Sequence, residues 1–198
     1  MIDLNNTVFL VDGKTEIKAL RDKFSKEYGI FPDVRKTGCN GKGVTPEGYV
    51  SASIGTLKLV LRNRYRHIIC IIDRESRAIS ARKLADKIRI TIVEQVSNNL
   101  IFRRDDIENK LIVCIPDRMF ENWIIADIKG IQVHSDLIDS SSKQKPFDGT
   151  NGIGILQKIM KVSYKKTIHG PKLFKSISFN RAKNNSPSFE NFFSAIIT

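Results

Sequence analysis

The sequence has little of what marks a secreted or membrane-spanning protein. Its three cysteines show no paired or metal-ligand spacing, which argues against a disulfide framework and a cysteine-bound metal. No apolar run approaches the roughly 18 residues of a transmembrane helix. The N-terminus enters a strand-like run directly and lacks the basic start and cleavage site of a signal peptide. We therefore expect a cytoplasmic protein with no membrane association.

Acidic residues are scarce in the last third of the chain. The segment from Lys143 to Lys183 holds ten Lys or Arg residues but one acid, Asp148, so that about +9 of the formal net charge of +12 lies there. Such a segment attracts phosphate groups, either of nucleic acid or of a nucleotide. The alternative is a solvated basic surface that aids solubility, but the scarcity of acids favours a polyanionic partner.

Short apolar runs alternate with helical patterns along most of the chain, and 41% of all residues are hydrophobic, which excludes a disordered protein. Strands are expected at 7–11, 30–35, 67–72 and 111–115. Helices are expected at 14–28, 49–63, 77–97 and 118–127, the third capped by Ser76. This alternation predicts an α/β fold with a mostly parallel central sheet flanked by helices.

Residues 1–139 are expected to form this α/β core, and residues 140–198 a basic helical extension packed on it. After a polar connector, helices are expected at 153–160, 171–175 and 187–197. The glycine-rich loop at 37–44 (TGCNGKGV) lacks the spacing of a P-loop. We interpret it as a connector, with phosphate contact by its backbone as the less favoured interpretation.

Acidic residues follow the predicted strands at the ends where ligands bind in open parallel sheets. Asp12 ends the first strand, and Asp73 ends the third, with Glu75 two residues further on. Glu16 lies in the first turn of the first helix, a position that the helix dipole favours for any acid. Together these carboxylates suit Mg²⁺ or Mn²⁺. The sequence therefore predicts a divalent metal site at this rim, provided that the first and third strands are neighbours.

The motifs around these acids resemble those of the Toprim superfamily. "VDGKTE" at 11–16 and "IIDRES" at 71–76 resemble its two signatures. "CIPDRMFENWIIAD" at 114–127 and the tail that begins "YKKTIHGPKLF" at 164–174 resemble further motifs of its small OLD-like and RloB-like branch. The resemblance therefore runs through most of the chain.

This resemblance implies a Mg²⁺-dependent or Mn²⁺-dependent nuclease that cleaves phosphodiester bonds in DNA or RNA. Its metal ligands would be Glu16, Asp73, Glu75 and Glu121, and its catalytic groups Asp12, Glu16 and Lys166. The expected nucleic-acid-binding residues are Lys165, Lys166, Lys172, Arg181 and Lys183. The resemblance also implies the effector of a bacterial anti-phage defence system, paired with an ABC-type ATPase.

Two departures from the family pattern support an alternative. Asp12 stands where the family usually has Glu, and Glu75 stands where it usually has a second Asp, so both positions keep their charge but change their reach. The alternative is a non-catalytic nucleic-acid-binding or regulatory subunit with a drifted site, which would bind nucleic acid equally well with and without metal. A third hypothesis is another phosphotransfer or nucleotide-processing enzyme, which would bind a small nucleotide and leave polymers intact.

Overall fold

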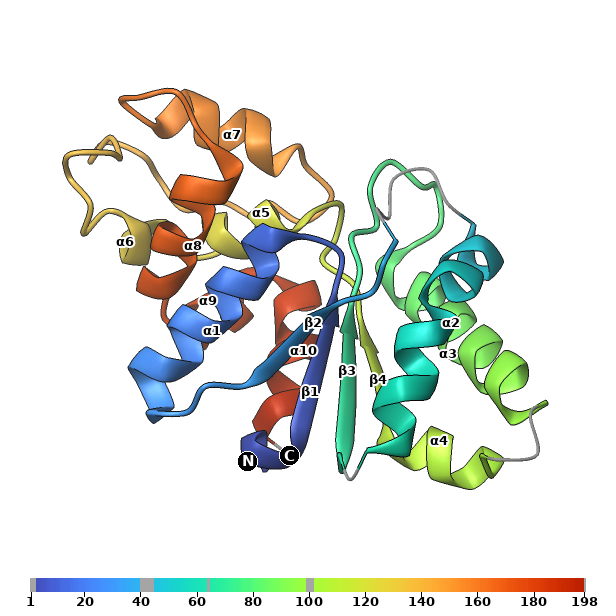
Figure 1. The fold of residues 1–198 in the computed structure, drawn as a ribbon. Coiled ribbons are helices and arrows are strands. Elements are labelled where there is room, and N and C mark those ends of the chain that lie inside the picture. The colour runs from blue at the N-terminus through green and yellow to red at the C-terminus, as the bar shows by residue number, and fades with distance from the viewer. Residues whose placement is uncertain (1–2, 40–44, 64, 99–101, 198) are drawn as a thin grey trace.

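The structure is a computed structural model that describes residues 3–39, 45–63, 65–98 and 102–197. Within these residues the centre of the fold is a four-stranded, all-parallel sheet in the order β2-β1-β3-β4 (Figure 1). The strands are β1 (Thr7–Val11), β2 (Asp33–Lys36), β3 (His67–Ile71) and β4 (Leu111–Cys114). The predicted α/β class is therefore confirmed, and so is the expectation that the first and third strands are neighbours.

Helices cover both faces of this sheet (Figure 1). One face carries α1 (Lys14–Tyr28), α5 (Phe120–Ile125), α6 (Ile128–Ile131), α7 (Gly152–Ile159), α8 (Lys166–Ser176), α9 (Phe179–Asn185) and α10 (Pro187–Ile197). The other face carries α2 (Pro46–Arg62), α3 (Ala81–Ser97) and α4 (Arg104–Lys110). A short 3-10 turn, Leu4–Asn6, precedes β1. None of the helices that the structure describes is long and apolar enough to cross a membrane.

Successive side chains of β1 enter two separate hydrophobic clusters. Phe9 and Val11 pack in the cluster that contains α1, whereas Val8 and Leu10 pack in the cluster that contains α2 and α3. All five residues of the strand are buried. This burial on both faces explains why the strand is an unbroken apolar run and not an alternation of apolar and polar residues.

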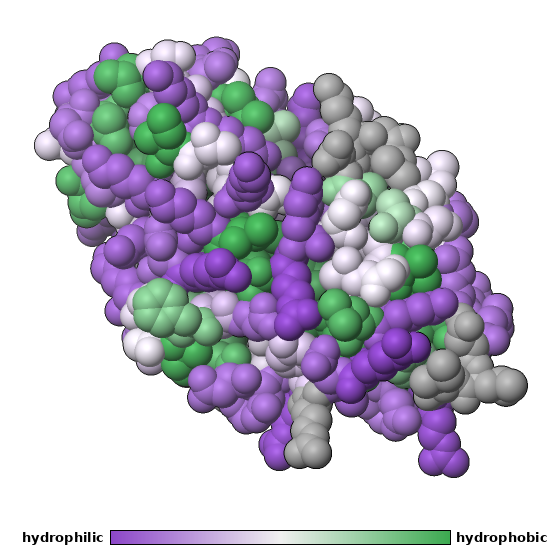
Figure 2. All heavy atoms as spheres, in the orientation of Figure 1, coloured by the Kyte–Doolittle hydropathy of each residue, from purple (hydrophilic) through white to green (hydrophobic). Residues whose placement is uncertain are grey.

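The C-terminal extension completes the hydrophobic cluster on the α1 face. Trp123 of α5 stacks on Phe192 of α10 with ring centroids 4.8 Å apart, and its Nε1 donates a hydrogen bond to Ser188 Oγ at 2.9 Å. Phe120 and Phe174 also lie 4.8 Å apart. Outside these contacts, the face drawn in Figure 2 is mostly hydrophilic, with small hydrophobic patches separated by polar residues.

The helix after β3 begins later than the sequence predicts. The sequence pattern starts this helix at residue 77 with Ser76 as its cap, but α3 begins at Ala81, and the Ser80 side chain accepts a hydrogen bond from the amide of Lys83. The prediction of Ser76 as the cap is therefore wrong. Residues 75 and 76 instead form a turn, in which Glu75 has a left-handed φ of 56°, and the helix follows this loop.

Three short helices and one long one also differ from expectation. The helices α4, α6 and α9 have seven residues or fewer, and the sequence does not predict them. So few residues show no clear helical period of apolar side chains. The sequence pattern starts α8 at Pro171, since proline favours the first helical turn. Instead α8 contains Pro171, because packing against α1 extends it back to Lys166. Of the predicted glycine-rich loop, residues 40–44 lie outside the described residues.

Candidate functional site

The carboxyl ends of β1 and β3 meet at one rim of the sheet, because the two strands pair with Val11 beside Ile71. Asp12 follows β1 directly, and Asp73 follows the end of β3. Both line a cleft of about 410 Å³, to which α1 contributes Glu16. We call this cavity the acid cleft, and it brings together acids that the sequence predicts at this rim.

Four further side chains of interest line the acid cleft. Glu75, predicted as a metal ligand, lies in its wall, and so does Lys166 from the start of α8. Lys14 and Lys36 also line it and are absent from the sequence-based prediction. Lys36 ends β2 at the same rim as Asp12, so the rule that placed the acids could have found this lysine too.

The position of Glu16 explains the glycine between the two acids of the first motif. Gly13 is the N-cap residue of α1 and adopts an extended conformation, with no side-chain cap. A Cβ atom at this position would lie 2.5 Å from Glu16 Oε2, much closer than any real Cβ contact. Glu16 itself is 5% exposed. Any larger residue here would therefore displace the Glu16 carboxylate, which folds back over the start of its own helix.

Lys166 joins two buried carboxylates from different elements. Its Nζ lies 3.4 Å from Glu16 Oε1 and 3.6 Å from Glu121 Oε1. Glu121 of α5 is fully buried and accepts a hydrogen bond from the Tyr164 hydroxyl at 3.1 Å. The sequence does not predict this contact between Tyr164 and Glu121. The arrangement places one ammonium between two carboxylates.

Three carboxylate oxygens around the acid cleft are buried without a hydrogen-bond partner among the described residues. They are Asp12 Oδ2, Glu16 Oε2 and Glu121 Oε2. An unpartnered buried oxygen costs free energy, and a group of them marks a place where a cation or a donor can bind. The donor set, carboxylate oxygen alone, fits Mg²⁺ or Mn²⁺.

The described side chains do not form a ready coordination shell. Within the described ranges, no group of three or more His, Cys, Asp or Glu residues is placed to hold one metal ion. Lys166, whose side chain is 40% exposed, provides the positive charge beside Glu16 and Glu121 in this arrangement. Binding of a divalent cation would therefore require the ammonium to move outward and the carboxylates to converge.

Burial changes the protonation of the acids in the cleft. It raises the pKa of Asp12 to about 7, which the hydrogen bond from Thr37 opposes and the charge of Glu16 reinforces. Burial also raises the pKa of Asp73 well above its usual range and raises the pKa of Glu121, and Lys166 opposes both shifts. Asp12 therefore exchanges its proton near neutral pH, and a divalent cation bound to its carboxylate would displace that proton.

Lys166 keeps its charge in the same cleft. Burial disfavours the charge on its ammonium, but Glu121, Glu16 and Asp73 outweigh that effect and raise its pKa above the ordinary value for lysine. The side chain is therefore a permanent cation at neutral pH.

The loops after β3 and β4 are tied together at the edge of the cleft. Glu75 and Arg118 both have a positive φ, 56° and 86°, although neither is glycine. The amide of Glu75 donates a hydrogen bond of 2.6 Å to the carbonyl oxygen of Arg118. Backbone strain of this kind is found most often where a structure must hold a functional group in place.

Arg181 and Lys183, both predicted to bind nucleic acid, contact other side chains of the protein. Arg181 donates two hydrogen bonds, of 2.8 and 2.9 Å, to the carboxylate of Asp127. Asp127, which is 1% exposed, also caps α6. Lys183 lies over the ring of Phe193, with its Nζ 4.7 Å from the centroid. Lys165 is exposed at the start of α8, and Lys172 is exposed further along it.

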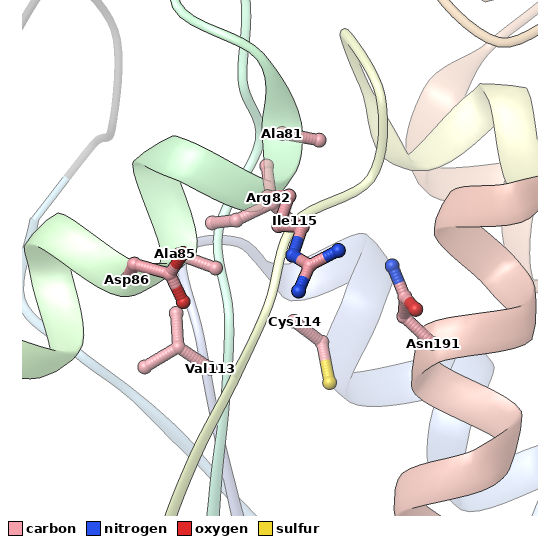
Figure 3. Close-up of a pocket in the computed structure, with 8 residues that line it drawn as sticks. All are labelled: Ala81, Arg82, Ala85, Asp86, Val113, Cys114, Ile115 and Asn191. Atoms are coloured by element: carbon pink, nitrogen blue, oxygen red, sulfur yellow. The ribbon is translucent and has the colours of Figure 1, made fainter.

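A second cleft, of about 460 Å³, lies beside β4 and away from the acid cleft (Figure 3). It is slightly larger, but Asp86 is the one acid among the described residues that line it. It also contains none of the unpartnered carboxylate oxygens. We therefore place the candidate chemistry in the acid cleft, and we call the second cavity the edge cleft.

Comparison with known protein families gives one match. The sequence model of a family described as "Domain of unknown function (DUF4276)" matches residues 11–197. The chain belongs to this DUF4276 family. The matched segment begins one residue before Asp12 and includes every residue of the acid cleft named above. No curated protein and no solved structure matches the chain. The description of DUF4276 names no activity, so the geometry of the site carries the functional argument.

Proposed function

We propose that this DUF4276 chain is a metal-dependent nuclease that cleaves phosphodiester bonds in DNA or RNA in the acid cleft. The observation that carries the proposal is the set of unpartnered buried carboxylate oxygens of Asp12, Glu16 and Glu121 beside Lys166. These groups gather at the carboxyl ends of parallel strands, where α/β proteins bind their ligands. The resemblance of the same motifs to Toprim nucleases points to the same chemistry.

The proposal assigns each side chain a role. Glu16, Asp73 and Glu121 would hold Mg²⁺ or Mn²⁺, with Glu75 at the wall of the cleft. When bound, such an ion neutralises charge on a phosphate and lowers the pKa of water. Asp12, with a pKa of about 7, accepts or releases a proton near neutral pH.

The lysines supply the remaining positive charge. Lys166 lies close enough to the acids to stabilise negative charge that develops on a phosphate. Lys14 and Lys36 line the same cleft and attract the phosphate backbone. The exposed Lys165 and Lys172 extend this surface along α8.

The proposal also includes a cellular compartment and a protein partner. Cys70 and Cys114 are buried free thiols, which suits the reducing cytoplasm. The resemblance to OLD-like nucleases supports an ABC-type ATPase as the partner and anti-phage defence as the role. Purification of the chain with the product of a neighbouring ATPase gene would test this part of the proposal.

A second candidate function rests on a specific observation. Lys166 already neutralises Glu16 and Glu121, and the described acids form no ready coordination shell. The second candidate is therefore a nucleic-acid-binding subunit that has lost its metal and its catalysis. It predicts binding that does not depend on Mg²⁺.

The two candidates are separated by one experiment. The purified protein is incubated with supercoiled plasmid or total tRNA in Mg²⁺, Mn²⁺ or EDTA, alongside Asp73→Asn and the control Asp105→Asn. Asp105 is an exposed acid of α4, on the other face of the sheet. Cleavage that needs metal, is lost in Asp73→Asn and persists in the control supports the nuclease. Binding without cleavage, equal in Mg²⁺ and EDTA, supports the second candidate.

A further inference from the structure

The strand β4 has an open side. It is the last strand of the sheet and pairs with β3 alone among the described strands. The edge cleft lies on its free side, with α3 on one flank and α10 on the other (Figure 3). The polar side chains that line it are Arg82 and Asp86 from α3 and Asn191 from α10. Val113 and Cys114 of β4 and the following Ile115 also line it.

The backbone groups on this open side have no partners within the described residues. The carbonyl of Cys114 accepts a hydrogen bond from Ile72, and that of Pro116 accepts one from Arg74, so residues 114 and 116 face β3. Because strand residues alternate, Val113 and Ile115 direct their amides and carbonyls toward the edge cleft. In the part of the chain that the structure describes, no backbone hydrogen bond satisfies these four groups. They form a template for another strand.

The two edges of the sheet differ in how they are protected. At the opposite edge, β2 carries Asp33, Arg35 and Lys36, and such charges discourage the addition of a strand. The four residues of β4 are Leu-Ile-Val-Cys, with no charge and no proline. Native proteins rarely leave an apolar edge of this kind unpaired. The difference points to the β4 edge as an interface.

We propose that the β4 edge pairs with the β4 edge of a second copy of this chain, antiparallel, to form a two-fold dimer with one continuous sheet. Val113 then lies opposite Ile115 of the second copy, and these residues exchange backbone hydrogen bonds in both directions. This inference is independent of the proposed nuclease activity.

Charge complementarity selects a second copy as the occupant. Arg82 lies at the Ile115 end of the edge cleft and directs its guanidinium into it, whereas Asp86 lies toward the Val113 end (Figure 3). Neither side chain has an ion-pair partner among the described residues. Antiparallel pairing reverses the second copy, so each Arg82 meets Asp86 of the other chain. The same surface thus supplies both halves of the contact, as a two-fold interface requires.

The decisive experiment is a charge reversal and its rescue, read by analytical ultracentrifugation. The measurements are made at about 0.15 M salt. At this concentration the salt screens the repulsion between two basic chains beyond a Debye length of about 8 Å. Wild type is expected to dimerise, and Arg82→Asp and Asp86→Arg are each expected to raise the dimer Kd about tenfold or more, because like charges then meet. The double variant Arg82→Asp/Asp86→Arg is expected to restore the wild-type Kd.

Several outcomes would overturn the proposal. The proposal is wrong if wild type stays monomeric at its highest soluble concentration. It is also wrong if the single variants dimerise like wild type, or if the double variant stays monomeric. Val113→Pro is an independent test, because it removes an amide that faces the edge cleft and leaves the pairing with β3 intact. It is expected to abolish the dimer with an unchanged circular dichroism spectrum. If Val113→Pro does not fold, the charge-reversal series decides alone.

Discussion

The ammonium of Lys166 lies 3.4 Å from Glu16 Oε1, although the two residues come from opposite ends of the chain. The same ammonium lies 3.6 Å from Glu121 Oε1, so one flexible side chain offsets two buried carboxylates. This relationship links the stability of the fold to the chemistry of the acid cleft, because any cation that replaces the ammonium must satisfy the same oxygens.

Replacing the ammonium should therefore destabilise the protein. Lys166→Met keeps most of the side-chain length and leaves Glu16 and Glu121 without a counter-charge. We expect a loss of about 1–2 kcal/mol at pH 7, less than for a fully buried ion pair because Lys166 is partly exposed. Urea unfolding measures this loss, and the exposed neighbour Lys165→Met serves as the control. Equal midpoints for the two variants would contradict the role given to Lys166.

Divalent cations should stabilise the Lys166→Met variant more than wild type. A ligand that binds the folded state raises its stability, and in this variant no ammonium competes for the carboxylates of Glu16 and Glu121. The measurement is the melting temperature with Mg²⁺ or Mn²⁺ against EDTA. Equal increases in the two proteins would show that the ion binds elsewhere.

The stability of the fold should depend on pH through Asp12. Its pKa is raised to about 7 in the folded chain, against about 4 in an unfolded chain, so the folded state holds the proton more tightly. The resulting stabilisation is present below pH 4 and is lost as the pH rises toward 7. Asp12→Asn removes this dependence. Between pH 4 and pH 7 the stability of the variant should therefore fall less than that of wild type, by a difference on the order of 1–3 kcal/mol.

The measurement for Asp12 is urea unfolding across this pH range. The control is Asp105→Asn, which removes an exposed acid and should follow the wild-type profile. Parallel profiles for wild type and Asp12→Asn would show that Asp12 titrates normally and would remove it as a proton donor or acceptor near neutral pH.

Glycine at position 13 should be required for the shape of the acid cleft. The added methyl of Gly13→Ala would displace the Glu16 carboxylate, and it would also replace a tolerated N-cap residue with a poor one, at a cost of about 1 kcal/mol. The rate of metal-dependent cleavage should fall by more than this loss of stability alone explains. Gly55→Ala is the matched control, because the new methyl would meet no described atom within 4 Å and α2 should gain about 0.5–1 kcal/mol.

The basic residues should divide into binding and structural groups. Lys172→Gln should weaken nucleic-acid binding and reduce the magnitude of its salt slope by roughly 0.9 for each phosphate that the protein no longer neutralises. Arg181→Gln should instead lower stability, because it removes the partner of the buried Asp127. Fluorescence anisotropy against salt concentration, together with thermal unfolding, measures both effects. If Arg181→Gln weakened nucleic-acid binding more than Lys172→Gln did, the two roles would have to be exchanged.

The acids of the cleft are predictable from the sequence because they follow directly after apolar runs, at the ends of strands. Asp12 and Asp73 follow such runs, and the pairing of β1 with β3 brings them to one rim. The helix start at Ala81 is harder to predict, since Ser76 and Ser80 are equally good caps by residue type. The chain forms a turn at Glu75, whose amide bonds to Arg118 in the loop after β4, and no local pattern in the sequence indicates this long-range contact.

The roles of the basic residues depend on tertiary packing that no local pattern reports. Lys166 and Arg181 belong to the same basic segment and look alike in the sequence. The packing of α8 against α1 places Lys166 between the carboxylates, whereas α9 places Arg181 against Asp127. The sequence also does not predict that β4 is an edge strand. The order of the strands depends on the crossover connections and not on the strands themselves.

The origin of the cleft in distant parts of the chain has a consequence for biosynthesis. β1 and α1 emerge from the ribosome long before α8, so a growing chain carries Glu16 without the ammonium that offsets it. The hydrophobic cluster on the α1 face of β1 also stays incomplete until α8 to α10 have been made. A nascent chain therefore cannot assemble the acid cleft. The acid cleft is complete only after α8, which contributes Lys166 and Thr167, has been made and has packed.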